Sequence, residues 1–394
     1  MYSPKQYETS GAIAQEPRLT RYLYIYDEVL YALLTELLMR KNLHTCYYLI
    51  SELYYTDTDI IFDLLWKIYF DFYAEHHPSL ETCIANKHRV WCISRDIKPV
   101  IFVIKNMFML QGSSTVFHLR QFVENGGKCM CLYRLQEKTL VKRGWKEYPK
   151  LICRLFIALE RRHIQNAGCY LYKLLAEYSS DEIYFMLMDY FSESVSLKNM
   201  TVIRKNWDRR MWYDDGHMLL AFMVSMSTPC ENIARRLTFK PPNEADLNFV
   251  NDISSVDDIL PYRALREKRR TVIVPEINAF RLVRSHVIHC AEKVRDNWEY
   301  YAFHSAIWKP RFARFGGYID GGKVKFTSEE NEARFYALYG LEPDEQSLDV
   351  QHAGHVYCDY NDQQDKFVCW RDWHDVVFQR EPRIVLHSDY KYQW

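Results

Sequence analysis

The sequence has few of the residues that interrupt helices. It contains 13 glycines and 13 prolines in 394 residues, whereas average usage is about 7 and 5 per cent. Sandwiches and barrels need turn residues at short intervals, so this scarcity argues against an all-β fold and favours long α-helices. We therefore expect a mainly α protein with a smaller mixed α/β region in its C-terminal part.

The sequence also lacks net charge, an export signal and a long apolar run. Lys plus Arg and Asp plus Glu number 51 each, so the overall charge requires no partner of either sign. The N-terminus has no basic segment followed by an apolar core, and the apolar runs 100–110 and 218–226 are too short to span a bilayer. The 11 cysteines show no Cys-x2-Cys pairing, which is typical of reduced thiols inside cells. We expect a protein that is neither secreted nor inserted in a membrane.

Residues 43–73 carry the strongest positive signal, the pattern of two amphipathic helices. Apolar residues recur three or four positions apart on both sides of Thr56-Asp57-Thr58-Asp59. The short oxygen-bearing side chains of that segment suit the start of a helix, because they accept hydrogen bonds from its free N–H groups. The stretch is therefore predicted to form a tight helical hairpin.

A similar unit recurs at an offset of 123 residues, and the two share six identical positions. Cys46, Tyr47, Tyr55, Ile60, Phe62 and Leu64 correspond to Cys169, Tyr170, Tyr178, Ile183, Phe185 and Leu187. Duplication would give stacked hairpins, a solenoid-like helical repeat, whereas coincidence between two similar hairpins is the alternative. In either case we expect a shared set of core residues, namely Ile60, Leu64, Ile68, Ile183 and Leu187.

Composition divides the chain into four parts. They are a polar N-terminal arm (1–21), a helical-hairpin repeat domain (22–195), a helical and mixed basic region (196–340) and an acidic aromatic C-terminal tail (341–394). Within the third part, the glycines of 316–322 predict a turn before a short strand at 323–326. A helix is then expected from Ser328 to Tyr339.

Residues 261–314 are the candidate nucleic-acid-binding region. They include twelve Lys or Arg and five Asp or Glu. On a helix, Arg263, Arg266 and Arg270 would share one side, with Arg269 beside them, as contact with a phosphate backbone would require. The alternative is a solvated face that pairs with the acidic stretch 243–258.

The C-terminal tail offers the only set of candidate metal ligands that we single out. These are His352, His355, Cys358, Cys369 and His374, residue types that bind zinc. Paired Cys-x2-Cys ligands are missing, and no P-loop, GxSxG or HExxH motif occurs. His217, close to Asp214, is interpreted as a turn residue. The sequence therefore predicts no catalytic residue, cofactor or assigned metal.

Three segments together resemble an uncharacterised protein family encoded by giant (nucleocytoplasmic large) DNA viruses of eukaryotes. They are LWKIYFDFY at 65–73, YRALREKRR at 262–270 and FYALYGLEPDEQ at 335–346. The resemblance spans roughly residues 20–350 and brings no catalytic residues with it. It implies a location in the host cytoplasm, the viral factory or the virion.

Three functions follow as hypotheses. The first is a non-enzymatic helical scaffold that binds other proteins in viral replication, transcription or particle assembly, because extended helical faces and many aromatic residues suit interfaces. The second is a nucleic-acid-binding accessory factor that uses 261–314. The third is a zinc-containing enzyme or zinc module in the tail. Strong salt dependence of binding would distinguish the second from the first.

Overall fold

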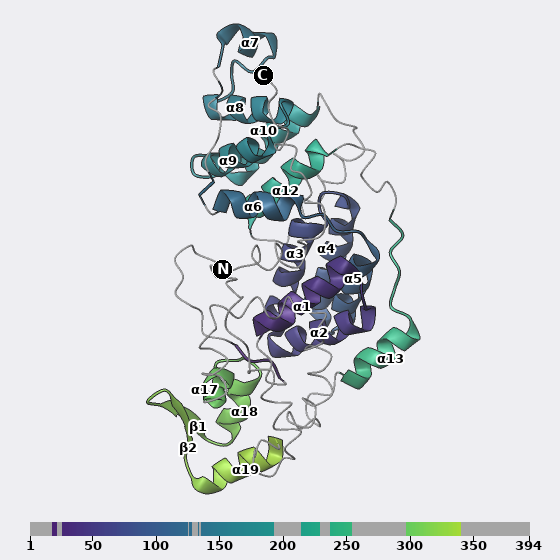
Figure 1. Cartoon of the computed structure of the whole chain (residues 1–394), viewed down its shortest axis with the longest axis vertical. Helices are drawn as coiled ribbons and strands as arrows, with labels where there is room; N and C mark the ends of the chain where they lie inside the picture. Colours follow the sequence, from purple (N-terminus) through teal and green to yellow (C-terminus); the bar gives the residue numbers. More distant parts are fainter. Residues whose placement is uncertain are drawn as a thin grey trace, which may run out of the picture.

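The computed structural model describes residues 18–21, 26–124, 126–127, 133, 135–192, 214–228, 237–253 and 297–339, and the statements below concern these residues. They are mostly helical, with one small antiparallel sheet (Figure 1). The expectation of a mainly α protein is confirmed. So is the largely helical character of the described residues between 22 and 195.

Short connections separate the helices of the first half of the chain. In order they are α1 Tyr26–Met39, α2 Leu43–Thr56, α3 Ile61–Phe72, α4 Pro78–Ser94, α5 Lys98–Met109, α6 Thr115–Glu124, α7 Glu137–Lys142, α8 Lys150–Glu160, α9 Ile164–Leu174 and α10 Ser180–Ser192. A 3-10 turn, η1 Thr58–Ile60, separates α2 from α3. The break at Thr56–Asp59 therefore lies where the sequence predicts it.

The second half contributes fewer described elements. They are α12 Asp215–Ser227, α13 Glu244–Ile253, α17 Trp298–Phe303, α18 Trp308–Arg314, β1 Gly317–Asp320, β2 Lys323–Phe326 and α19 Glu329–Tyr339. The strands form a hairpin that turns at Gly321 and Gly322, both with positive φ. Glycine adopts that backbone conformation without a steric penalty. The predicted turn, strand and start of the last helix are confirmed.

Three helix connections use an arginine in the left-handed conformation. Arg40, Arg95 and Arg162 have φ of 53°, 50° and 57°. After α1, the Lys41 amide donates to the Glu36 carbonyl at 3.1 Å, and after α8 the His163 amide donates to the Ala158 carbonyl at 2.8 Å. These are the bonds that satisfy free carbonyls at a helix end and turn the chain back.

The helices pair differently from the predicted hairpin. α2 packs along α1 and α5, whereas α3 packs along α6 and α12; the other close sequential pairs are α4 with α5 and α8 with α9. The expectation that 43–73 forms a tight hairpin is therefore wrong, although its turn is correctly placed. The reason is that both helices of that stretch bury wide apolar surfaces, which other helices cover.

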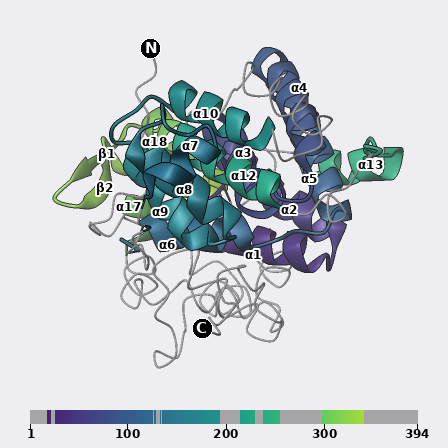
Figure 2. The same ribbon diagram turned by 90° about the horizontal axis from the view of Figure 1, so that it is seen from above.

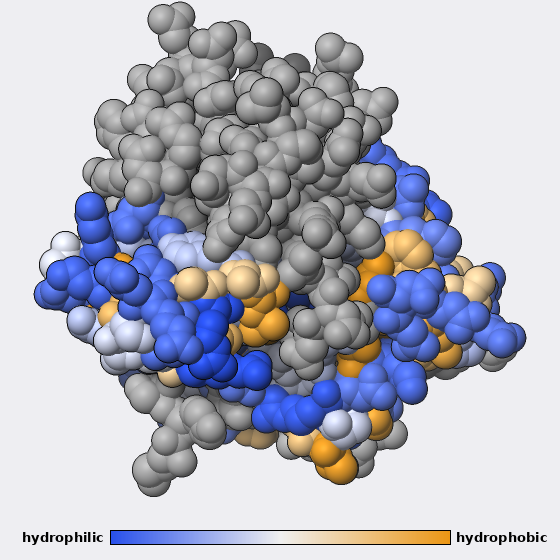
Figure 3. Space-filling view, turned by 90° about the horizontal axis from the view of Figure 1, so that it is seen from below, coloured by the Kyte–Doolittle hydropathy of each residue, from blue (hydrophilic) through white to orange (hydrophobic). Residues whose placement is uncertain are grey.

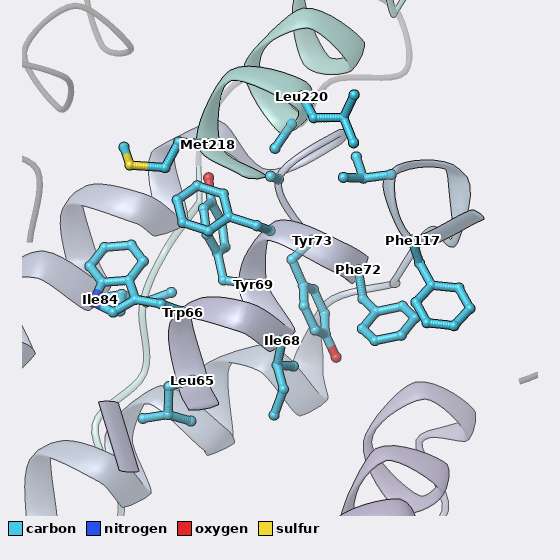
Figure 4. Packing of buried hydrophobic residues seen from close by; sticks show 14 of the residues in the cluster. Leu65, Trp66, Ile68, Tyr69, Phe72, Tyr73, Ile84, Phe117, Met218 and Leu220 are labelled. Atoms are coloured by element: carbon cyan, nitrogen blue, oxygen red, sulfur yellow. The ribbon is translucent and has the colours of Figure 1, made fainter. Parts of the chain in front are cut away.

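α3 lies at the centre of the largest core. Leu65, Ile68 and Phe72 are almost fully buried, and the Phe72 ring stacks on Phe117 from α6 with centroids 5.2 Å apart. Figure 4 shows these side chains with Met218 and Leu220 of α12 above them. α12 is buried along nearly its whole length because it contacts α3, α6, α9 and α10.

The two predicted repeat units differ in which side chains they bury. Phe62 is 1 % exposed, but its counterpart Phe185 is 56 % exposed. Ile68, Ile183 and Leu187 are fully buried as predicted, whereas Ile60 and Leu64 are only partly buried against the core. α10 thus presents its buried face at a different rotation from α3, because different neighbours cover the two helices: α6 and α12 pack on α3, and α12 packs on α10.

The described residues of the predicted arm are packed into the protein. Leu19 and Thr20 are fully buried, and the Thr20 carbonyl accepts a 2.9 Å hydrogen bond from Trp308 Nε1. Trp308 is itself fully buried on α18. Residues 18–21 therefore join the N-terminal helices to the module formed by α17, α18, the hairpin and α19.

Candidate functional site

The side chains singled out for nucleic-acid or metal binding lie outside the described residues. This holds for Arg263, Arg266, Arg269 and Arg270, and for His352, His355, Cys358, Cys369 and His374. Within the described ranges, no group of three or more His, Cys, Asp or Glu is placed to hold a metal ion. The candidate site must be sought among other residues.

Asp71, Arg120 and His217 form a buried polar cluster, and the more exposed Glu124 lies at its edge. Asp71 accepts two hydrogen bonds from Arg120, at 2.9 Å from Nε and 2.8 Å from Nη2. His217 Nε2 lies 2.9 Å from the same carboxylate, and Arg120 Nη1 also donates to Glu124 at 2.7 Å. The cluster joins α3, α6 and α12 around a carboxylate that is fully buried.

The electrostatics of the cluster favour a permanently ionised Asp71. Burial alone would raise the pKa of this carboxyl, but the charges and hydrogen bonds of Arg120 and His217 hold the pKa below its ordinary value. Burial raises the pKa of Glu124, which Arg120 only partly opposes. A carboxylate fixed in the ionised state by a bidentate arginine is suited to structural cross-linking.

Local sequence explains how His217 reaches this position. Asp214 caps α12 and accepts a 2.9 Å hydrogen bond from the His217 amide, which places the imidazole on the first turn of the helix. The interpretation of His217 as a turn residue is therefore wrong: His217 belongs to α12, and its ring lies in the core against the Asp71 carboxylate. The sequence feature that could have indicated this partner is Asp71, a charged residue within the otherwise apolar run 68–73.

A small cavity lies beside the cluster. Its volume is about 20 Å³, enough for about one water molecule. Polar groups on its wall come from Tyr69, Glu81 and Ser225, and burial followed by the Glu81 charge raises the pKa of the Tyr69 hydroxyl. A space of this size fits a bound water between α3, α4 and α12.

Other buried polar groups also join distant segments. Arg21 Nε donates to Glu52 at 2.7 Å, and Arg21 Nη2 donates to the Ile253 carbonyl at 2.7 Å. Thr228 donates to Glu75 at 3.2 Å. These contacts resemble the Asp71 cluster in linking elements far apart in the sequence, so the interior polar groups act as ties between helices.

The exposed surface offers a different kind of feature on α4. Val90 and Ile93 are 50 % and 89 % exposed and lie three residues apart, so they share one side of the helix with Asn86 and Arg89. α4 extends along the edge of the molecule when it is viewed from above (Figure 2). We refer to Asn86, Arg89, Val90 and Ile93 as the α4 face.

Where the described residues are visible from below, most are polar, and the apolar ones form smaller separate areas (Figure 3). Among the described helices, none combines the length and the apolar character needed to cross a membrane. Comparison with protein-family models, curated proteins and solved structures finds no match to this chain. The function must therefore be argued from the residues described above.

Proposed function

We propose that this protein is a non-enzymatic α-helical interaction protein that binds a partner protein through the α4 face. The observation that carries the proposal is the exposure of Val90 and Ile93 on one side of a helix whose opposite side is tightly packed. Leu80, Ile84 and Trp91 are buried on that opposite side. Exposed apolar residues on a rigid helix are typical anchors for a partner.

The charges around the α4 face define the chemistry of the partner. Arg89 lies next to Val90, and its guanidinium contacts only the Asn86 side chain, at 3.1 Å, among the described residues. Arg95 and Lys98, in contrast, are each close to a carboxylate, Asp59 at 3.0 Å and Asp96 at 3.6 Å. A complementary partner would present an apolar side chain flanked by Asp or Glu, as an acidic amphipathic helix does.

The finer aspects of the proposal rest on sequence. A solenoid-like stacking of helical hairpins other than 43–73 would extend the binding surface, and the resemblance to a family of giant DNA viruses would place the partner in replication, transcription or particle assembly. The alternatives are nucleic-acid binding through 261–314 and a zinc enzyme or zinc module in the tail. A gel-shift titration and a metal analysis of the purified full chain test these alternatives directly.

The experiment compares partner capture by the wild-type chain and by the double variant Val90→Asp, Ile93→Asp. A partner identified by cross-linking is purified, and its Kd for both proteins is measured by calorimetry. We expect the double variant to bind at least about tenfold more weakly, because carboxylates would replace the apolar anchors and repel an acidic partner. Raising the salt concentration should weaken wild-type binding as well.

A matched control changes exposed apolar residues elsewhere. Phe185 and Leu338 are 56 % and 45 % exposed on α10 and α19. The variant Phe185→Asp, Leu338→Asp introduces the same two charges, so it should retain the wild-type Kd. Equal binding by the wild type and the α4 variant would overturn the proposal.

A further inference from the structure

The described part of the chain contains a second basic region, between α7 and α9, that the sequence analysis did not identify. Residues 142–162 include seven Lys or Arg and two Asp or Glu. The excess of positive charge per residue is higher here than in 261–314, where twelve Lys or Arg and five Asp or Glu are spread over a longer stretch. Lys142, Arg143, Lys146, Lys150, Arg161 and Arg162 are all exposed. We call these six residues the α7–α9 basic surface.

Tertiary contacts bring the two ends of this stretch together. Arg143 forms an ion pair with Glu160, the last residue of α8, so the connector after α7 lies beside Arg161 and Arg162. The connector is held on α8 by Trp145, whose ring centroid is 5.2 Å from that of Phe156. Cations from two separate segments therefore occupy one end of the molecule (Figure 1).

Most of this positive charge has no acidic partner in the part of the chain that the structure describes. Among the described residues, ion pairing on this surface is confined to Arg143, and no carboxylate pairs with Lys142, Lys146 or Lys150. Arg161 lies over the Tyr133 ring at 5.2 Å, a contact that leaves its charge uncompensated. α9 begins directly after Arg162 and His163, and its dipole adds positive potential at the same place.

We propose that the α7–α9 basic surface binds the phosphate backbone of a nucleic acid. A protein partner would require an apolar centre, but apart from Val141 the exposed side chains from 141 to 150 are Lys, Arg and Glu. Nucleic-acid interfaces are instead polar and strongly positive. Among the described residues of this surface, Tyr133 and Trp145 are buried, and Tyr148 is half-buried with its hydroxyl bonded to Asp189, so we expect contacts with phosphates rather than stacking on bases, and binding that is independent of sequence.

The inference is independent of the α4 face, and the test uses the full chain. Fluorescence anisotropy measures the affinity for a labelled DNA duplex, a single-stranded DNA and an RNA, each of about 20 nucleotides in length, between roughly 50 and 200 mM salt. The test variant is Lys142→Glu, Lys146→Glu, Lys150→Glu. It avoids the Arg143–Glu160 pair. A glutamate at the first residue of α8 favours the dipole of that helix, whereas one at Lys142, the last residue of α7, opposes the dipole of α7, so circular dichroism must first show that the variant is folded.

We expect the wild type to bind and the test variant to bind at least about tenfold more weakly, with a log–log salt slope on duplex DNA that is smaller by about 2 to 3. The matched control Lys41→Glu, Lys240→Glu, Lys323→Glu changes the net charge equally at exposed positions elsewhere and should bind like the wild type. The three probes distinguish duplex from single strand and DNA from RNA.

Two results would overturn the inference. One is that the wild type binds none of the three probes at the lowest salt concentration, and the other is that test and control variants lose affinity equally, which would indicate only a net-charge effect. Competition by poly-glutamate at the same charge concentration as effectively as by nucleic acid would assign the surface to an acidic protein instead. The variant Val90→Asp, Ile93→Asp should bind nucleic acid like the wild type, which separates this inference from the proposed function.

Discussion

At the scale of single residues, the buried polar side chains are explained by the groups that they contact, not by a need for solubility. His88 illustrates this on α4. Its ring lies flat against Phe62, with centroids 4.4 Å apart and planes 3° apart, and its Nδ1 accepts a 3.1 Å hydrogen bond from Trp66 Nε1. Only the neutral imidazole has a free acceptor nitrogen, so the native structure requires the unprotonated ring.

Stability should therefore decrease as His88 becomes protonated. Burial, with Arg95 and Arg89 nearby, lowers the pKa of His88 from 6.5 to about 4. Because the unfolded chain takes up the proton first, stability should fall as the pH decreases from about 6.5 to about 4, by up to about 2 kcal/mol at pH 5. Urea denaturation at pH 7 and pH 5 measures this. His88→Gln, which cannot titrate, should show a smaller difference between the two pH values; an equal difference would contradict the assignment.

Asp71 gives a second residue-scale prediction. Asp71→Asn removes the buried counter-charge of Arg120 and leaves it only the more exposed Glu124, so it should lower the free energy of unfolding by about 3 to 5 kcal/mol. The comparison is Asp59→Asn, since the Asp59 side chain is 86 % exposed and pairs with an exposed arginine. That change should cost less than about 1 kcal/mol. Similar urea midpoints for the two variants would show that the Asp71 cluster is not a structural tie.

At the scale of elements, helix pairing decides which apolar residues are buried. The 3.6-residue periodicity correctly predicts that α3 and α10 are helices, but it does not say which neighbour covers each face. Gly168 shows how closely α6 and α9 pack: a Cβ atom there would lie 2.9 Å from Leu119 Cδ1. Nothing in the sequence identifies α6 as the neighbour of α9, because that contact depends on the whole arrangement.

The two predicted repeat units should respond differently to the same truncation. Leu187→Ala removes a fully buried side chain and should cost about 2 to 5 kcal/mol, from lost burial and a residual cavity. Leu64 is only partly buried, so Leu64→Ala should cost less than Leu187→Ala. Chemical denaturation of both variants tests the order. A larger loss for Leu64→Ala would mean that α3 buries the face originally predicted.

At the scale of the whole molecule, a few contacts hold distant segments together. Trp308 connects α18 to residue Thr20, and Arg21 connects the same N-terminal segment to α2 and to the end of α13. Thr20 and Trp308 are 288 residues apart in the chain, and Arg21 and Ile253 are 232 residues apart. The short stretch 18–21 is therefore a joint between the parts of the protein that the structure describes.

Removing the contact between Trp308 and Thr20 should destabilise α17, α18 and α19 but not α8 and α9. Trp308→Ala deletes a fully buried ring and its hydrogen bond to Thr20, so hydrogen exchange should accelerate in α17, α18 and α19. Amides of α8 and α9, at the other end of the molecule, should keep their protection (Figure 1). Trp308→Phe retains most of the packing and serves as the milder control. Uniform loss of protection would instead show that the protein unfolds as one unit.

The sequence by itself determined the local structure: the helical class, the break at Thr56–Asp59, the turn at the paired glycines and the strand that follows. These features depend on residues within a few positions of one another. α4 was not predicted, since its buried side includes His88 among the apolar residues. The predicted nucleic-acid and zinc side chains lie outside the described residues, so they stay predictions.

Only the tertiary structure decided which groups meet. Asp71 and His217 are 146 residues apart, and the cations of the α7–α9 basic surface come together because Arg143 reaches Glu160. The periodicity of a sequence shows which side of a helix is apolar, but not which other helix covers that side. The sequence spacing of two charged residues does not show whether they form a salt bridge. The polar ties, and the exposure and pairing of side chains that define the two proposed surfaces, could be found only after the helices had been placed in space.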